Sequence, residues 1–446
     1  MNDDKKACFI ADPGRVAELA RDIRDGALSP VDLVQRYVDR IAAVNGAVEA
    51  WRERDCEAAL VTAETLAAEA KAGTIRGPLH GIPLGVKDII DVAGLPTRCN
   101  SNSLADAAPA TADAEIVAAL RAAGAIILGK THTTEFALRD PSPARNPHNL
   151  AHTPGGSSSG SAAAVASGMA PVALGTQTMA SVNRPAAYCG IGAFKPTTRA
   201  MPGAGIALLS SLYDTVGFYG GRVEDACTVF EAVCPPGLRG AGAAEDTERM
   251  LSVTVLTDPF IEAADTEIHR ATANAADRMR DAGHAVAVTA SPVSFEALFR
   301  AHRLAMEYEI GRIRRAFLDE PQGMIGPLLL ETIRDGLKIT DEAYFAARRS
   351  MDAMRAEFFA AFPATDAFLW PATPKPAPKG LAWTGDASYI SPWTALAGPV
   401  VTMPSGRVAA GLPVGCLLAG APGADLAFAG IARRLADAAE DHDTLL

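Results

Sequence analysis

Short apolar runs alternate with helical segments along most of this chain, and this alternation limits the folds open to it. Apolar stretches of strand length occupy residues 82–90, 125–128, 171–174, 252–256, 284–289, 367–370, 400–403 and 414–418. Helical periodicity lies at 114–123 and 265–282. Strands that alternate with helices usually build a parallel or mixed sheet covered by helices on both faces. The sequence therefore predicts an α/β fold around a large, twisted mixed β-sheet.

The chain contains no long linker that would divide it into separate domains. Apolar residues three and four apart predict helices across 13–72, with Ser29 as a helix N-cap and Pro30 as the first helical residue. We therefore predict a single domain over residues 1–446. Its parts are a helical N-terminal arm, a core, and a second half whose loops are expected to shape a binding pocket: residues 1–75, 76–235 and 236–446.

Composition argues against several classes of protein. The 446 residues carry 41 Lys+Arg and 52 Asp+Glu, a net charge of −11, with 6% aromatic residues, which argues against a nucleic-acid partner. No apolar run reaches the roughly 18 residues of a membrane span, and the first residues lack the apolar core of a secretory signal. The seven cysteines are scattered without a CxxC pair, which is typical of reduced thiols and not of a zinc site. We expect a cytoplasmic protein without membrane or nucleic-acid partners.

A block of small residues interrupts the middle of the chain. Residues 154–161 read PGGSSSGS, and an Ala-rich helix is expected to follow at once. Glycines permit close backbone approach, and the free N–H groups of a helix start can bind an anion or a polarised oxygen. A Gly/Ser linker is the structural alternative. A phosphate-binding loop is another, but the GxxxxGK[ST] pattern is absent.

Lys87 interrupts the apolar run at 82–90. A buried lysine is costly unless it is paired or neutral. Because burial lowers the pKa of an amine, Lys87 would then be a competent base. The alternative is a lysine at a strand end that pairs with Asp88 or Asp91.

Ser181 lies shortly after the strand predicted at 171–174, where a nucleophilic serine could be exposed. The GxSxG pattern is absent, however. His80, His132 and His148 are isolated, and none lies in a comparable small-residue context, so the residues alone do not favour a Ser-His-Asp triad.

Three segments together resemble the amidase signature family of serine hydrolases, which cleave carbon–nitrogen bonds with a Ser–cisSer–Lys triad. They are GIPLGVKDIIDVAGLPT around Lys87, PGGSSSGSAAAVASGMAPVALGTQT, and ASVNRPAAYCG around Ser181. The resemblance covers nearly the whole chain and is strongest over 77–196, while GLPVGCLLAG looks like the final strand of the family. It implies the amidase-signature fold, without a metal or cofactor.

The resemblance also implies roles for individual residues. Lys87 would be the base, Ser157 the bridging serine that follows a cis peptide bond, and Ser181 the nucleophile; these residues lie 70 and 24 positions apart, as in the family. Backbone N–H groups before the nucleophile would form the oxyanion hole: Thr178, Met179 and Ala180. Because Lys87 must be neutral to act, activity is expected to fall below neutral pH.

Two departures from the family pattern concern substrate binding. Met179-Ala180 replaces the usual Gly-Gly, which adds an apolar side chain beside the acyl pocket and would be strained at positive φ. Many members carry Arg where this chain has Asn183. Arg184 comes one residue later, as in the malonamidase-type members that the chain resembles most closely. There it would hold a substrate carboxylate; the alternative is a structural arginine paired with an acid or with backbone carbonyls.

The resemblance favours a hydrolase that cleaves small linear amides through an acyl-enzyme on Ser181. The same chemistry on carbamates (urethanes) or anilides is one alternative, and an amidotransferase-type subunit that needs a partner is another. The oligomeric state stays open, although family members often form homodimers. Apolar candidates for the pocket rim, most of which could equally be core residues, are Met179, Leu208, Leu209, Leu212, Tyr213 and Met306.

Overall fold

The computed structural model describes residues 9–238 and 249–439. Its strands form one mixed sheet of eleven, in the order β1-β3-β2-β4-β6-β5-β10-β11-β9-β7-β8. The strands are β1 (Trp51–Arg54), β2 (Pro83–Lys87), β3 (Ile126–Thr131), β4 (Val172–Gln177), β5 (Gly192–Lys195), β6 (Thr215–Gly220), β7 (Ser252–Thr257), β8 (Ala285–Ala290), β9 (Ala367–Pro371), β10 (Val400–Arg407) and β11 (Pro413–Ala419). The prediction of an α/β fold with a mixed sheet is confirmed.

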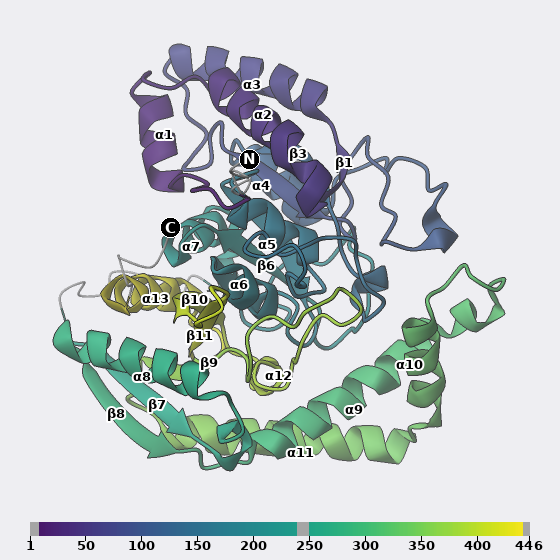
Figure 1. Ribbon diagram of the computed structural model, residues 1–446, viewed down its shortest axis with the longest axis vertical. Coiled ribbons are helices and arrows are strands. Elements are labelled where there is room, and N and C mark those ends of the chain that lie inside the picture. Colours follow the sequence, from purple (N-terminus) through teal and green to yellow (C-terminus); the bar gives the residue numbers. More distant parts are fainter. Residues whose placement is uncertain (1–8, 239–248, 440–446) are drawn as a thin grey trace, which may run out of the picture.

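Thirteen α-helices accompany this sheet within the described residues. They are α1 (Val16–Arg24), α2 (Pro30–Val48), α3 (Cys56–Lys71), α4 (Glu115–Ala122), α5 (Ser159–Ala166), α6 (Asn183–Cys189), α7 (Val223–Val233), α8 (Thr266–Asp281), α9 (Phe295–Ile313), α10 (Pro327–Lys338), α11 (Asp341–Ala361), α12 (Ser391–Ala395) and α13 (Asp425–Ala439). Figure 1 shows α1, α2 and α3 at one end of the molecule and α9, α10 and α11 at the other. Ser29 caps α2 as predicted, because its hydroxyl accepts a hydrogen bond from the Val31 N–H.

Helices cover both faces of the central sheet, because successive residues of a strand point to opposite sides. On β5 and β6, Ala193 and Tyr219 belong to a core cluster with the side chains of α5 and α6. Their neighbours Phe194 and Phe218 face the other way and pack on Phe230 of α7, at ring distances of 4.5 and 6.0 Å.

Strand β3 is longer than the sequence predicted, because Gly129 does not end it but makes room for the neighbouring strand. The apolar run at 125–128 predicted a strand that stops before Gly129, yet β3 continues through this glycine to Thr131. Gly129 has φ +147°, and a Cβ there would lie 2.3 Å from the Glu53 carbonyl oxygen of β1. The glycine therefore lets β1 approach β3, and the prediction of a strand end was wrong. Three strands were not predicted at all: β1, β5 and β6.

Helices α9 and α10 pack unusually close to one another. A Cβ on Gly336 would lie 1.9 Å from the backbone oxygen of Glu307, and one on Gly311 would lie 2.8 Å from the carbonyl carbon of Gly336. The two glycines thus set the separation of these helices. This matters for the site, since both helices contribute side chains to its wall.

The described cysteines form no disulfide: Cys56, Cys99, Cys189, Cys227, Cys234 and Cys416 are free, and Cys8 lies outside the described residues. Within the same residues, no helix combines the length and apolarity that a bilayer span requires.

Candidate active site

Lys87 is the last residue of β2 and is fully buried. Its Nζ lies 2.7 Å from Ser157 Oγ and 2.8 Å from Thr176 Oγ1. Burial lowers the pKa of Lys87 from 10.5 to about 7, although the negative charge of Asp214 acts to raise it. A substantial neutral fraction is therefore expected at neutral pH. The alternative pairing with Asp88 does not occur, because Asp88 pairs with Lys130 at 2.9 Å.

Ser157 follows the Gly156–Ser157 peptide bond, which is cis, as the family resemblance implied. Only 1% of Ser157 is exposed, and its carbonyl accepts a hydrogen bond of 3.1 Å from the Thr134 N–H. The next residue links this segment to the expected nucleophile, since the Ser158 N–H donates to the Ser181 carbonyl at 3.4 Å. The structure thus brings the segments of Ser157 and Ser181 into direct contact.

The turn between β4 and α6 carries Ser181 and is held by Gln177. The Gln177 Oε1 accepts hydrogen bonds from the N–H groups of Val182 and Asn183 at 2.9 and 3.1 Å. Its Nε2 donates to Thr394 Oγ1 at 3.0 Å, and that hydroxyl donates to the Met179 carbonyl at 2.7 Å. One side chain therefore braces the turn on both sides of Ser181.

Met179 and Ala180 form this turn without backbone strain. Neither is among the described residues with positive φ, so the strain considered for a Gly-Gly replacement does not arise. Across the described chain, no acceptor takes the N–H groups of Met179, Ala180 or Ser181. These donors are therefore available at the floor of the neighbouring pocket.

Arg184 lies in the first turn of α6, and 7% of it is exposed. Its Nη2 donates to the Gly156 carbonyl at 2.6 Å, and its Nη1 donates to the Gly385 carbonyl. Both terminal nitrogens thus bind backbone oxygens, while Nε has no partner among the described residues. Of the two interpretations drawn from sequence, this geometry fits the structural arginine paired with carbonyls.

A pocket of about 540 Å³ opens onto these residues. Its floor includes Thr178, Met179, Ala180, Ser181 and Arg184. The remaining wall comes from distant parts of the chain and is more apolar than polar, although Arg139, Arg303, Glu307 and Asp386 also line it. Its larger apolar side chains are Leu138, Leu209, Phe299, Met306, Leu328 and Trp383. Pockets of 300–1,000 Å³ typically hold drug-sized ligands.

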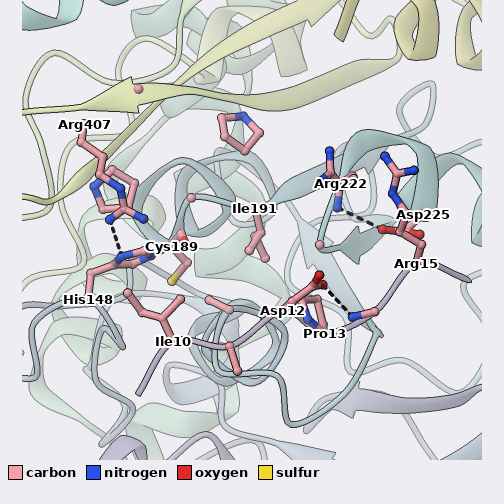
Figure 2. Close-up of a pocket in the computed structure, with 18 residues that line it drawn as sticks. Ile10, Asp12, Pro13, Arg15, His148, Cys189, Ile191, Arg222, Asp225 and Arg407 are labelled. Carbon is pink, nitrogen blue, oxygen red and sulfur yellow. Dashed lines mark hydrogen bonds between the residues drawn. The ribbon is translucent and has the colours of Figure 1, made fainter. Parts of the chain in front are cut away.

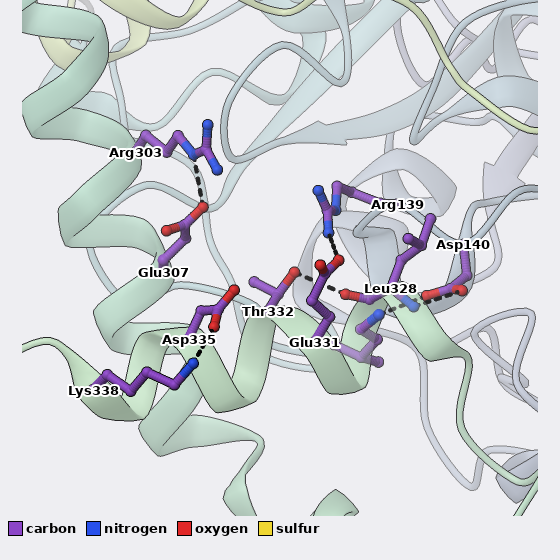
Figure 3. Close-up of polar contacts among 10 residues, drawn as sticks. Arg139, Asp140, Arg303, Glu307, Leu328, Glu331, Thr332, Asp335 and Lys338 are labelled. Atoms are coloured by element: carbon purple, nitrogen blue, oxygen red, sulfur yellow. Dashed lines mark hydrogen bonds and ion pairs between the residues drawn. The ribbon is translucent and has the colours of Figure 1, made fainter.

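Ion pairs flank the wall of this pocket that α9 and α10 form (Figure 3). Arg303 Nε lies 2.7 Å from Glu307 Oε1 on α9, and Arg139 Nη2 lies 2.7 Å from Glu331 Oε2 on α10. The carboxylate of Asp140 accepts hydrogen bonds from the first N–H groups of α10, a favourable position for an anion. The pocket wall is thus fixed to the loop that follows β3.

Only part of the predicted pocket rim lies in the pocket. Met179, Leu209 and Met306 line it. Leu208 lines a neighbouring cavity, while Leu212 and Tyr213 lie at a third. Thr176, Phe299 and Trp383 were not predicted as site residues. Thr176 lies within the quoted Gly/Ser-rich motif and could have been found there, whereas Phe299 and Trp383 have no local signal in the sequence.

A smaller cavity of about 70 Å³ lies between the N-terminal segment and β10 (Figure 2). Here Arg407 Nη1 donates a hydrogen bond of 2.9 Å to His148 Nδ1, so the ring proton must lie on Nε2. That Nε2–H donates to the Cys189 carbonyl at 2.9 Å. Burial lowers the pKa of His148 to about 4. His148 is thus a neutral, internally bonded residue, and it does not line the pocket at Ser181.

Comparisons with known proteins give the family and the overall fold of this chain. A family model described as Amidase matches residues 32–428. A glutamyl-tRNA(Gln) amidotransferase subunit of Roseiflexus castenholzii is 32% identical over 91% of both chains. Among solved structures, a crystal structure of an amidase is 29% identical with a TM-score of 0.83, covering 94% of this chain and 98% of that one. The peptide amidase of Stenotrophomonas maltophilia is 28% identical with a TM-score of 0.80, covering 95% and 96%.

Proposed function

Because this chain belongs to the amidase family, we propose that it hydrolyses the carbon–nitrogen bond of an amide through an acyl-enzyme on Ser181. The observation that carries this proposal is the 2.7 Å contact between Lys87 Nζ and Ser157 Oγ, buried beside the pocket that Ser181 lines. A buried amine with a lowered pKa next to a hydroxyl is the arrangement expected of a general base.

In the proposed reaction, neutral Lys87 takes a proton from Ser157, and Ser157 takes one from Ser181. The Ser181 Oγ attacks the amide carbonyl to form a tetrahedral intermediate. When this collapses, the proton returns through Ser157 to the departing amine, and the acyl group stays on Ser181. Water then attacks the ester by the reverse proton route, which releases the acid and regenerates the free serine.

The N–H groups of Thr178, Met179 and Ala180, the donors expected from the sequence, and that of Ser181 are proposed to stabilise the oxyanion. Among the described residues none of these N–H groups has an acceptor, and all four residues line the pocket floor. Each donor aimed at a developing oxyanion lowers the activation free energy by roughly 3 kcal/mol. The groups belong to the backbone, so the replacement of Gly-Gly by Met179-Ala180 leaves the chemistry in place.

The substrate that fits this pocket best is an uncharged amide with an apolar or aromatic group. About 540 Å³ is more than a short acid amide such as malonamate needs, and the wall is rich in apolar side chains. Arg184 supports the same choice, because both of its terminal nitrogens already bind backbone carbonyls. Anilides fit this description, and aryl carbamates are the alternative with the same leaving-group chemistry.

A second candidate is the amide-hydrolysing component of an amidotransferase. It is favoured by the 32% identity to the glutamyl-tRNA(Gln) amidotransferase subunit over nine tenths of both chains. A chain of that kind is expected to release ammonia from glutamine efficiently only with its partner subunits. Glutamine therefore belongs among the substrates tested.

The test is product release by the purified chain from malonamate, simple aliphatic amides, anilides, aryl carbamates and glutamine. Ser181→Ala and Lys87→Ala are expected to lower turnover by ~10⁴-fold or more, while Ser350→Ala, an exposed serine on α11, is the matched control. Activity that survives Ser181→Ala would overturn the nucleophile assignment. Turnover of malonamate alone would overturn the proposed substrate class and return Arg184 to carboxylate binding.

A further inference from the structure

A second cavity of about 240 Å³ lies beside the substrate pocket. The two cavities share Ala137, Thr178 and Leu209 in their linings. The second cavity is also lined by Thr176 and by the carboxylate-bearing residue Asp214. The proposed reaction assigns no role to Asp214, although it reaches the turn that carries Ser181.

Asp214 joins two segments of the site through its carboxylate. Its Oδ1 accepts a hydrogen bond of 2.6 Å from the hydroxyl of Thr178. Its Oδ2 accepts hydrogen bonds of 2.7 and 3.1 Å from the N–H groups of Leu209 and Ser210. Leu209 lines the substrate pocket, so one carboxylate holds both the start of the nucleophile turn and part of the pocket wall.

The same cavity brings Asp214 close to the surroundings of the proposed base. Thr176 and Thr178 are two residues apart at the end of β4, and both line this cavity. Thr176 Oγ1 lies 2.8 Å from Lys87 Nζ, while Thr178 Oγ1 donates to Asp214. The amine of Lys87 and the carboxylate of Asp214 thus bind two threonines that lie two residues apart on the same segment.

We propose that Asp214 is a positioning residue, which fixes Thr178 beside the nucleophile and holds a negative charge next to the buried amine of Lys87. This inference rests on the proposed function, because it gives Asp214 a part in preparing the base. The negative charge favours protonation of Lys87, while burial of the amine opposes it. The balance between the two sets the pH at which Lys87 becomes neutral.

Other charged groups near this pair are few among the described residues. Cys99 is the second titratable group that acts on Lys87, and burial raises its thiol pKa to about 12, so it is neutral at ordinary pH. Two cations lie nearby. Burial lowers the pKa of the Arg314 guanidinium while Asp214 acts to raise it, and Arg199 lines the same cavity as Asp214. Asp88 pairs with Lys130. Burial raises the pKa of Asp214, while the hydrogen bonds from Thr178, Leu209 and Ser210 favour its carboxylate form. Among the described residues, Asp214 is therefore the acidic group expected to act on the titration of Lys87.

The experiment measures the titration of Lys87 directly, so that it does not depend on a known substrate. The chain has nine lysines, and ¹³C-lysine labelling followed by NMR across pH 5–11 resolves them, with Lys87→Met to assign the signal. In Asp214→Asn the titration midpoint of Lys87 is expected to fall by ~1 pH unit. The asparagine has a single acceptor oxygen, which can serve Thr178 on one side or the N–H groups of Leu209 and Ser210 on the other.

Glu309→Gln is the matched control. The carboxylate of Glu309 accepts hydrogen bonds from Ser210, Ser211 and Leu212 of the same loop. The titratable groups that act on Lys87 are Asp214 and Cys99, so Glu309 is expected to leave the pKa of Lys87 unchanged. This variant is expected to lower the thermal stability of the loop while the Lys87 midpoint stays unchanged. Equal shifts in Asp214→Asn and Glu309→Gln would overturn the proposal, because they would report a general disturbance of the loop.

Two further outcomes separate this inference from the proposed function. A lowered Lys87 midpoint in a chain that hydrolyses no amide would support the placement of Asp214 and contradict the proposed function. The opposite result is an active enzyme in which Asp214→Asn changes neither the titration midpoint of Lys87 nor the fall of kcat/KM at low pH. That result would overturn the role of Asp214 and leave the proposed function standing. Thr178→Val is the second variant if Asp214→Asn does not fold; it is expected to lower kcat without moving the midpoint.

Discussion

The guanidinium of Arg184 donates a hydrogen bond of 2.6 Å to the carbonyl oxygen of Gly156, the residue directly before Ser157. Its other terminal nitrogen binds the carbonyl of Gly385, in the loop that carries Trp383. A single cation therefore connects the segment of the bridging serine to the pocket wall. The planar fork of an arginine presents two separate terminal nitrogens to these two acceptors, whereas a lysine would have to reach both from a single nitrogen.

Arg184→Lys is expected to lower kcat at least ~10-fold for neutral and acidic amides alike, because the two carbonyls lose a common donor. The measurement compares malonamate with a neutral amide of the same length. Arg139→Lys is the matched control, since Arg139 lines the same pocket but pairs with Glu331 at its surface. A loss confined to malonamate would instead show that Arg184 binds a substrate carboxylate.

The activity is expected to depend on pH through Lys87. The pKa of Lys87 is lowered to about 7, and the neutral form is the base, so kcat/KM should be half-maximal near pH 7. Below that value it should fall about tenfold per pH unit. Circular dichroism across the same range checks that the fold persists, because burial raises the pKa of Asp225 to about 6 and this carboxylate binds the start of α1. An acid limb that still rises at pH 9 would contradict this assignment.

Trp383 is expected to select substrates with apolar groups. It lines the pocket, yet 59% of it is exposed, so a bound aromatic group could cover it. Trp383→Ala should raise KM about tenfold for an anilide, equivalent to roughly 1.4 kcal/mol, and leave a short aliphatic amide almost unchanged. Phe345→Ala on α11 is the control, because this exposed ring lies outside the pocket. Equal effects on both substrates would exclude the proposed contact.

Gly336→Ala is expected to destabilise the protein by ~2–4 kcal/mol, because the new methyl group would push α9 and α10 apart. Thermal or denaturant unfolding measures the loss. Gly430→Ala provides the comparison, since a Cβ there meets nothing within 4 Å and alanine favours the helix by up to ~1 kcal/mol. If both variants were equally stable, the close approach of the two helices would not limit the fold.

The local parts of the fold could be predicted from the sequence. Alternation of strands and helices indicated the mixed sheet, and the Ser29-Pro30 pair marked the start of α2, because capping depends on adjacent residues. The prediction at Gly129 was wrong, because a glycine within an apolar run usually indicates the end of a strand. Here the glycine instead makes room for the backbone of the partner strand β1, which the sequence does not reveal. That partner, β1, is short and has no strand-like pattern of its own.

The candidate site divides in the same way. Lys87, Ser157 and Ser181 lie in motifs that the sequence displays, and the structure places their segments together, although their catalytic roles stay predictions. Phe299 and Trp383 reach the pocket only because distant elements fold over it. Arg184 was visible, but its binding partners were not, because they are backbone oxygens from two separate loops.

The proposed reacting groups and the pocket wall come from different stretches of the chain. The former lie between Lys87 and Ser181, whereas much of the wall comes from α9, α10 and the loop around Trp383. Substitutions in the later stretch can therefore alter which molecule is accepted without disturbing the bond-breaking apparatus. Such a division allows new preferences to evolve by gradual exchange of one module, and it makes the same stretch the natural target for laboratory redesign.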